Sequence, residues 1–197
     1  MNTVTHFLVG WVVANADHLN RRERAAVTVS GIIPDIDSVG IIAEKLTQGS
    51  DHPLLWWSKY HHVLAHNLGF GLFVAIVVFV MANMAKRKWL TTGLAFLSFH
   101  LHLLGDIVGA RGPDGYHWPI PYLLPFWNGW EITWSGQWAI NAWPNFVITG
   151  VALVITFFLV WKRGYSPLEM LSTSADRAFV KTIRARFGHP KKNRKLE

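Results

Sequence analysis

A histidine and an aspartate lie four residues apart in a long apolar run near the middle of the chain. The run is "GLAFLSFHLHLLGDIVGA" (93–110), and the pair is His102 and Asp106. On a helix this spacing places both side chains on one face, where they can clamp a metal ion or join two helices by a hydrogen bond. A charged side chain at the centre of a membrane helix costs about 2.5–3.5 kcal/mol on insertion scales, so we expect Asp106 to have a partner. His100 lies on another face, and we expect it to be structural.

Two carboxylates follow a helix-stopping proline in "GIIPDID", where Pro34 precedes Asp35 and Asp37. In an extended segment both side chains point to the same side. Because the motif holds no cation, they repel each other unless a metal ion or another cation lies between them. The alternative is a pair of solvated turn carboxylates, with Asp35 capping a helix.

Three histidines stand within six residues in "KYHHVLAHNLGF", namely His61, His62 and His66. Helical spacing favours His62 together with His66, because His61 and His66 would be splayed by about 140° on a regular helix. His61 reaches inward only if the helix begins near it. A fourth histidine, His6 in "VTHFLVG", is isolated, and it becomes a candidate ligand only in the company of the others.

Together these motifs form a set of nitrogen and oxygen ligands for a divalent metal. The chain has no cysteine, so thiolate sites and disulfides are excluded. Imidazole with carboxylate suits Zn, Mn or Fe, as one ion or as two ions bridged by a carboxylate. The partner that Asp106 requires would then be a metal ion.

The elements that must position these residues are predicted to be membrane helices. Apolar residues make up 51% of the chain, and three long apolar runs cover 68–85, 90–110 and 146–161. Each approaches the roughly 20 residues needed to span the hydrocarbon core and is flanked by Trp and Lys/Arg. We therefore expect an all-α, multi-pass membrane bundle with three clear membrane helices. Two short apolar helices, 3–16 and 25–33, precede them. Each is shorter than the hydrocarbon core, so the sequence leaves open whether it spans the membrane.

Charge divides the chain into a body, 1–163, and a basic tail, 164–197. Residues 162–197 hold ten Lys/Arg and three Asp/Glu, so the whole net charge of +7 lies there. The positive-inside rule makes this tail and the "RRER" and "KRK" segments cytoplasmic. His102 and Asp106 then lie roughly 18 and 24 Å from the cytoplasmic end of their helix, at 1.5 Å per residue. Residues 168–187 form a basic amphipathic helix or an ordinary membrane anchor, and no cleavable signal peptide is evident.

The order of the motifs resembles a known family of bacterial inner-membrane proteins. Its pattern is Thr-His, Pro-Asp-x-Asp, His-Arg-Gly-x-Thr-His-Ser and His-x-x-x-Asp, which appear here as "TH" (5–6), "PDID" (34–37), "HHVLAHN" (61–67) and "HLLGD" (102–106). The family is described as metal-dependent hydrolases, LexA-binding and YdjM-like, distantly related to zinc-dependent phospholipase C and P1 nuclease. The resemblance covers roughly residues 3 to 145.

The resemblance implies a phospholipase C-like core and a set of metal ligands. The implied ligands are His6, Asp35, His61, His66, His102 and Asp106. The family pattern selects His61, whereas helical spacing favours His62. Two positions depart from the pattern, since His62 replaces an arginine and Asn67 a serine. A missing arginine removes a bidentate phosphate anchor, which makes a phosphate substrate less secure.

The Trp-rich loop 111–145 adds further polar side chains on the same side. His117 is a candidate third-site ligand or acid/base, Arg111 a candidate anion contact, and Asp114 and Glu131 are weaker candidates. The alternative is a structured loop anchored at the membrane interface by its tryptophans.

The function expected from these residues is metal-dependent hydrolysis of an ester or phosphoester at the non-cytoplasmic membrane face, with lipid-linked esters as one class of substrate. Bound metal would activate water, with Asp37 as general base or bridging ligand and His117 as acid/base. Two alternatives use the same residues differently: an ion or proton transporter with a His/Asp relay, and a regulatory or scaffold protein that acts through its basic tail. No nucleic-acid recognition motif accompanies that tail, so membrane lipids are the expected partners.

Overall fold

The computed structural model describes residues 1–82, 87–112 and 115–190. The elements in chain order are α1 (Thr3–Ala14), α2 (Arg21–Ser30), η1 (Ile33–Val39), α3 (Gly40–Thr47), α4 (Trp56–Tyr60), α5 (Leu68–Met81), α6 (Lys88–Gly109), α7 (Trp143–Arg163), η2 (Pro167–Met170) and α8 (Thr173–Phe187), where η marks a 3-10 helix. Only two isolated β-bridges, both in the loop before α7, interrupt this pattern in the described ranges. The expected all-α class is therefore confirmed.

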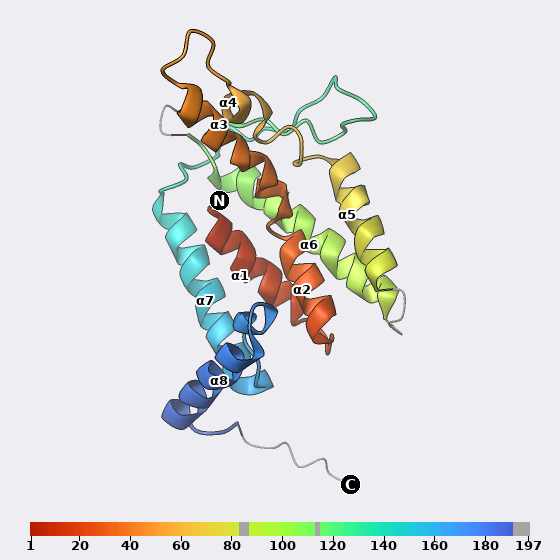
Figure 1. The fold of residues 1–197 in the computed structure, drawn as a ribbon, viewed down its shortest axis with the longest axis vertical. Coiled ribbons are helices and arrows are strands. Elements are labelled where there is room, and N and C mark those ends of the chain that lie inside the picture. Colours follow the sequence, from red (N-terminus) through yellow and green to blue (C-terminus); the bar gives the residue numbers. More distant parts are fainter. Residues whose placement is uncertain (83–86, 113–114, 191–197) are drawn as a thin grey trace.

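The centre of the fold is a layer of α1, α2 and α6, with α5 and α7 on the two flanks and α8 across the lower end of α7 (Figure 1). Small residues let the central helices approach closely. A Cβ added to Gly10 would lie 3.0 Å from the carbonyl oxygen of Thr28, and one added to Gly31 would lie 2.6 Å from Ser98 Oγ. Close backbone approach through Gly, Ser and Thr is typical of helix packing in membranes.

Two described helices, α6 and α7, are long and apolar enough to cross a membrane. A third span exists if α2 and the segment Ile33–Thr47, which meet at a bend of 54°, form one crossing. The expectation of three clear membrane helices was therefore wrong for the run 68–85. Its described helix, Leu68–Met81, has 14 residues and is roughly 21 Å long, short of the roughly 30 Å core.

Local signals near the amino terminus differ from the sequence expectation in two places. The second short apolar helix, expected at 25–33, begins earlier, because Asn20 and Glu23 form a capping box that starts α2 at Arg21. The segment containing Asp35 and Asp37 was expected to be extended, but Pro34 lies in the first turn of the 3-10 helix η1. Proline favours this position because its φ angle is already helical and it needs no hydrogen bond there.

The segment after α7 folds back against the helical body. Gly164, with a φ of 83°, ends α7, and η2 follows directly. Arg24 of α2 then forms a buried bidentate ion pair with Glu169, with both N–O distances 2.7 Å. The guanidinium also lies 3.6 Å from the ring centroid of Tyr165. The amphipathic helix expected at 168–187 is thus divided into η2 and α8, which begins after the N-cap Ser172.

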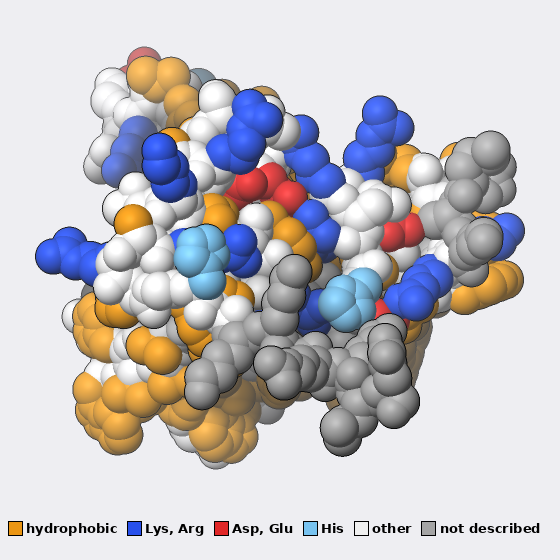
Figure 2. Space-filling view, turned by 90° about the horizontal axis from the view of Figure 1, so that it is seen from below, with side chains coloured by type: hydrophobic (Ala, Val, Ile, Leu, Met, Phe, Trp, Pro, Cys, Tyr) orange, Lys and Arg blue, Asp and Glu red, His pale blue; other side chains and the backbone are white. Residues whose placement is uncertain are grey.

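The lower face of the molecule, seen in Figure 2, carries many Lys and Arg side chains and few acidic ones. The sides of the bundle are apolar instead, and α7 exposes large residues such as Phe146 and Val154. This division suits a membrane protein whose helix sides contact lipid and whose basic end contacts water and headgroups.

Candidate metal centre

Four segments that are far apart in the sequence meet at the end of the bundle opposite the basic face. They are the start of α1, the helix η1, the loop 61–67 before α5, and the carboxyl-terminal half of α6 (Figure 1). Each carries at least one of the ionisable residues singled out by the sequence. Their convergence requires the central helices to pack in register, because no two of the segments adjoin in the chain.

Four side chains point one ligand atom each at a common position, and these atoms all lie within 4.8 Å of one another. The residues are Asp35, His66, His102 and Asp106. His102 Nε2 lies 3.1 Å from both His66 Nε2 and Asp106 Oδ2, and 3.7 Å from Asp35 Oδ1. The distance from His66 Nε2 to Asp106 Oδ2 is 3.4 Å. Ligands at about 2.0–2.1 Å in a tetrahedral zinc site are separated by about 3.3 Å, so these spacings fit such an ion.

Hydrogen bonds on the far side of each imidazole determine which nitrogen faces the cluster. His102 Nδ1 donates to the carbonyl oxygen of Gly31 at 2.9 Å, and His66 Nδ1 donates to Asp37 Oδ2 at 3.0 Å. A neutral ring that donates through Nδ1 has only a lone pair at Nε2. The two Nε2 lone pairs therefore face each other at 3.1 Å beside the Asp106 carboxylate, and this arrangement is repulsive unless a cation lies between them.

A proton is the alternative cation. Burial disfavours the charged form of His66, but the hydrogen bonds with Asp106 and Asp37 outweigh it and raise the pKa of His66 to about 9. In the metal-free site, a proton on His66 can therefore lie between the two imidazoles below about pH 9. Hydrogen-bonded histidines of this kind, each oriented by a carboxylate or carbonyl, are typical of metal sites.

The second oxygen of Asp106 is held by other groups. Asp106 Oδ1 lies 3.1 Å from His6 Nε2 and contacts the α-amino group of Met1. The His6 ring stacks on His102 with a centroid distance of 3.7 Å. The backbone oxygen of Asp106 accepts a hydrogen bond from Gln137 Nε2 at 2.8 Å. His6 therefore borders the cluster through Asp106, and sequence reasoning missed Gln137 because nothing in its surroundings signals a role.

Asp37 lies behind the cluster, where it clamps two histidines. One of its oxygens lies 2.7 Å from His61 Nδ1 and the other binds His66, while the backbone N–H of Ala65 donates to it at 3.3 Å. In this position Asp37 orients His66. His61, which was predicted as a ligand, also binds Asp37 and is not among the four converging residues.

His62 lies beside the cluster, in the same loop as His61 and His66. It has a φ of 66°, an unusual left-handed conformation for a residue other than glycine. Its Nε2 lies 3.7 Å from Asp106 Oδ2, and its ring is buried under Trp118. Burial lowers the pKa of His62 well below its usual value, which leaves the ring neutral.

The remaining candidates lie apart from the four ligands. His117 has a buried Nε2 without a hydrogen-bond partner in the described part of the chain, and Glu131 is exposed. Arg111 pairs through its backbone with Trp138 and Ile140, and Asp114 falls outside the described residues. His100 turns to the hydroxyl of Tyr122 and the carbonyl of Phe96.

Comparison with known proteins gives one match. The family model described as YdjM inner membrane protein matches residues 1–171, which cover all the motifs of the cluster. Neither the curated proteins nor the solved structures contain a match to the chain. The helical spans, the His/Asp cluster and this match agree, and the chain belongs to the YdjM inner membrane protein family.

Proposed function

We propose that the protein is a membrane-bound metal-dependent hydrolase whose metal is held by Asp35, His66, His102 and Asp106. One observation carries the proposal. The Nε2 atoms of His66 and His102 face each other at 3.1 Å beside Asp106 Oδ2, and both rings are oriented by hydrogen bonds through Nδ1. Among common cations, a divalent ion satisfies two lone pairs and two carboxylates at once.

The ligand chemistry favours Zn, with Mn and Fe as alternatives, because two imidazoles and two carboxylates surround the position without cysteine. When bound, the ion would supply Lewis acidity, polarising a substrate oxygen and lowering the pKa of water. Asp35 is the most exposed ligand, with 16% of its side chain accessible against 0–2% for the others. Substrate and water therefore approach from the side of Asp35.

The surrounding residues have separate roles in this proposal. Asp37 fixes the orientation of His66, in place of the role as base or bridging ligand expected from the sequence. His62 presents a neutral ring beside Asp106, and because burial lowers its pKa well below the usual value, it is a weak base that borders the site. His117 has an unpaired buried nitrogen and remains the candidate for acid/base work.

Orientation in the membrane completes the proposal. The positive-inside rule assigns the basic face of Figure 2 and the tail after α7 to the cytoplasm. The metal centre then lies at the non-cytoplasmic face, where it would act on an ester or phosphoester. A distant relationship to zinc-dependent phospholipase C and P1 nuclease is part of the same proposal, and it rests on the types of ligand alone.

Metal content tests the proposal. The protein is purified in mild detergent without an oligohistidine tag, and bound metals are measured by mass spectrometry for wild type, His102→Ala and Asp106→Ala. His100→Ala is the matched control, because His100 lies on the same helix and binds Tyr122. We expect about one equivalent of metal in wild type and the control, and none in the other two variants.

Metal-loaded protein is then screened for release of product from phosphoester and carboxylic ester lipids. A folded wild type that takes up no metal even after reconstitution would refute the hydrolase. In that case proton flux in vesicles tests the His/Asp cluster as a relay.

A further inference from the structure

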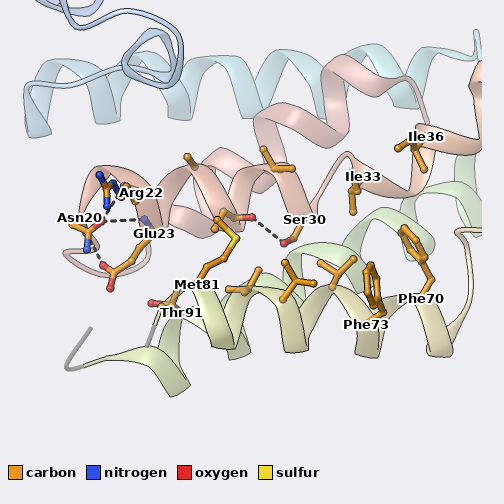
Figure 3. Close-up of a pocket in the computed structure, with 17 residues that line it drawn as sticks. Asn20, Arg22, Glu23, Ser30, Ile33, Ile36, Phe70, Phe73, Met81 and Thr91 are labelled. Atoms are coloured by element: carbon orange, nitrogen blue, oxygen red, sulfur yellow. Dashed lines mark hydrogen bonds between the residues drawn. The ribbon is translucent and has the colours of Figure 1, made fainter. Parts of the chain in front are cut away.

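A long apolar groove runs along the side of the bundle between α2 and α5. Both helices pack on α6, and the space between them has a volume of about 1050 Å³. Figure 3 shows that Ile33, Ile36, Phe70 and Phe73 line one end, whereas polar side chains gather at the other. We call it the α2–α5 groove.

Two of the polar side chains at the far end, those of Asn20 and Glu23, form hydrogen bonds with nearby backbone groups. Asn20 Oδ1 accepts hydrogen bonds from the backbone N–H groups of Arg22 and Glu23, and Glu23 accepts one from the backbone N–H of Asn20. Thr91 Oγ1 is the one buried polar side-chain atom of the described lining that has no hydrogen bond, so a ligand in the groove meets hydrocarbon along most of its length. This selects an apolar occupant.

The length of the groove is close to that of an extended acyl chain. The lining residues of α5 extend from Phe70 to Ala82, which is roughly 18 Å at 1.5 Å per residue. Half of a hydrocarbon core about 30 Å thick is about 15 Å. An extended acyl chain in one leaflet covers the same distance.

The groove opens toward the membrane. Valines 29 and 77 line the groove and are each 38% exposed, so it opens to the side of the bundle. In a membrane, that side is bathed by lipid chains.

The upper end of the groove adjoins the metal centre. Ile36 lies next to Asp35 in η1, and Phe70, in the first turn of α5, follows His66 by four residues. A chain lying in the groove with its head at this end would bring its ester within reach of the ligands. The exposed ligand Asp35 belongs to the same short helix as the lining residues.

We propose that the α2–α5 groove binds the acyl chain of a membrane lipid and presents the ester-bearing head of that lipid to the metal centre. This inference rests on the proposed function and names its substrate class. The lipid enters sideways from the membrane, with its head toward Ile36 and its methyl end toward Ala82.

Photo-crosslinking in vesicles tests both the site and the direction of the chain. The full-length protein is reconstituted in phosphatidylethanolamine and phosphatidylglycerol, with a small fraction of phosphatidylglycerol carrying a diazirine. The diazirine lies near the carboxyl end of the acyl chain in one probe and near its methyl end in the other. We expect the first probe to label peptides around Ile36 and Phe70, the second to label those around Met81 and Ala82, and both to exceed labelling around Val154 on the lipid-facing side of α7 severalfold.

A groove-filling substitution supplies the matched comparison. Val77→Trp fills the groove, whereas Val80→Trp adds the same ring on the same helix at a position that is 65% exposed and outside the groove. Enriched labelling should be lost in Val77→Trp and kept in Val80→Trp. Val29→Trp fills the groove from α2 and is the alternative groove-filling variant if Val77→Trp does not fold.

Metal content measured on the same samples separates the two proposals. Labelling that is uniform over the lipid-facing helices, or unchanged in a folded groove-filling variant, overturns the groove even when wild type is fully metal-loaded. Reversed labelling by the two probes overturns the stated direction of the chain. A wild type without metal refutes the proposed hydrolase by itself, whatever the pattern of labelling.

Discussion

Replacing Asp37 by asparagine tests whether this residue orients a metal ligand or binds the metal itself. Asp37 uses one carboxylate oxygen for His61 and the other for His66, at 2.7 and 3.0 Å. Asparagine has a single acceptor oxygen, so Asp37→Asn can keep only one of these bonds. Loss of such an outer partner of a ligating histidine weakens metal binding by roughly 10–100-fold, or about 1.4–2.7 kcal/mol.

The assay is competition for zinc with a fluorescent chelator, in detergent and at fixed pH. Asp106→Ala removes a ligand and should abolish measurable binding, whereas Glu131→Gln changes an exposed carboxylate and should leave the affinity unchanged. Asp37→Asn should lie between these limits. An affinity equal to that of wild type would refute the orienting role, and a complete loss of binding would show that Asp37 is itself a ligand.

Three further predictions concern protons, the ion pair and the packing of the site. Because the metal-free protein holds a proton on His66 below a pKa of about 9, metal must displace it, and affinity should rise roughly tenfold per pH unit up to that value. Zinc titrations between about pH 6 and about pH 9 check this, and a flat profile would contradict it. Arg24→Ala leaves the buried carboxylate of Glu169 without its partner and should destabilise the protein by about 3–5 kcal/mol, measured by thermal unfolding. The double change Arg24→Met with Glu169→Leu removes both charges and should destabilise it much less. Gly31→Ala places a Cβ 2.6 Å from Ser98 Oγ and should lower the free energy of unfolding by about 1–3 kcal/mol. It should also weaken metal binding, because the carbonyl of residue 31 holds His102. Adding Ser98→Ala should restore part of both losses.

Periodicity and composition were enough for several features of the protein. The i, i+4 spacing of His102 and Asp106 predicts a common helix face, and the structure shows their ligand atoms 3.1 Å apart. Long apolar runs predict membrane helices, and α6 and α7 agree. The order of the short motifs indicates the family, which the match over residues 1–171 confirms. Each of these depends only on local geometry or on the order of residue types.

The loop 61–67 shows where spacing arguments fail. Helical spacing favoured His62 with His66, but α4 ends at Tyr60 and α5 begins at Leu68, so the histidines lie in an irregular turn. With a φ of 66° at His62, the three rings point in directions that no regular period describes. Tertiary contacts of this loop with η1 and Trp118 decide which ring meets the metal centre.

The sequence by itself determined the membrane class and the face of α6 that carries His102 and Asp106. Tertiary structure decided the roles of the two aspartates after Pro34. In an extended segment Asp35 and Asp37 would share a side, but in the 3-10 helix η1, with three residues per turn, they are turned roughly 120° apart, so that one faces the cluster and the other supports His66 from behind. The carbonyl of Gly31, which fixes the tautomer of His102, carries no signal in the sequence because every residue has a carbonyl, and only the packing of α2 against α6 brings this one into place.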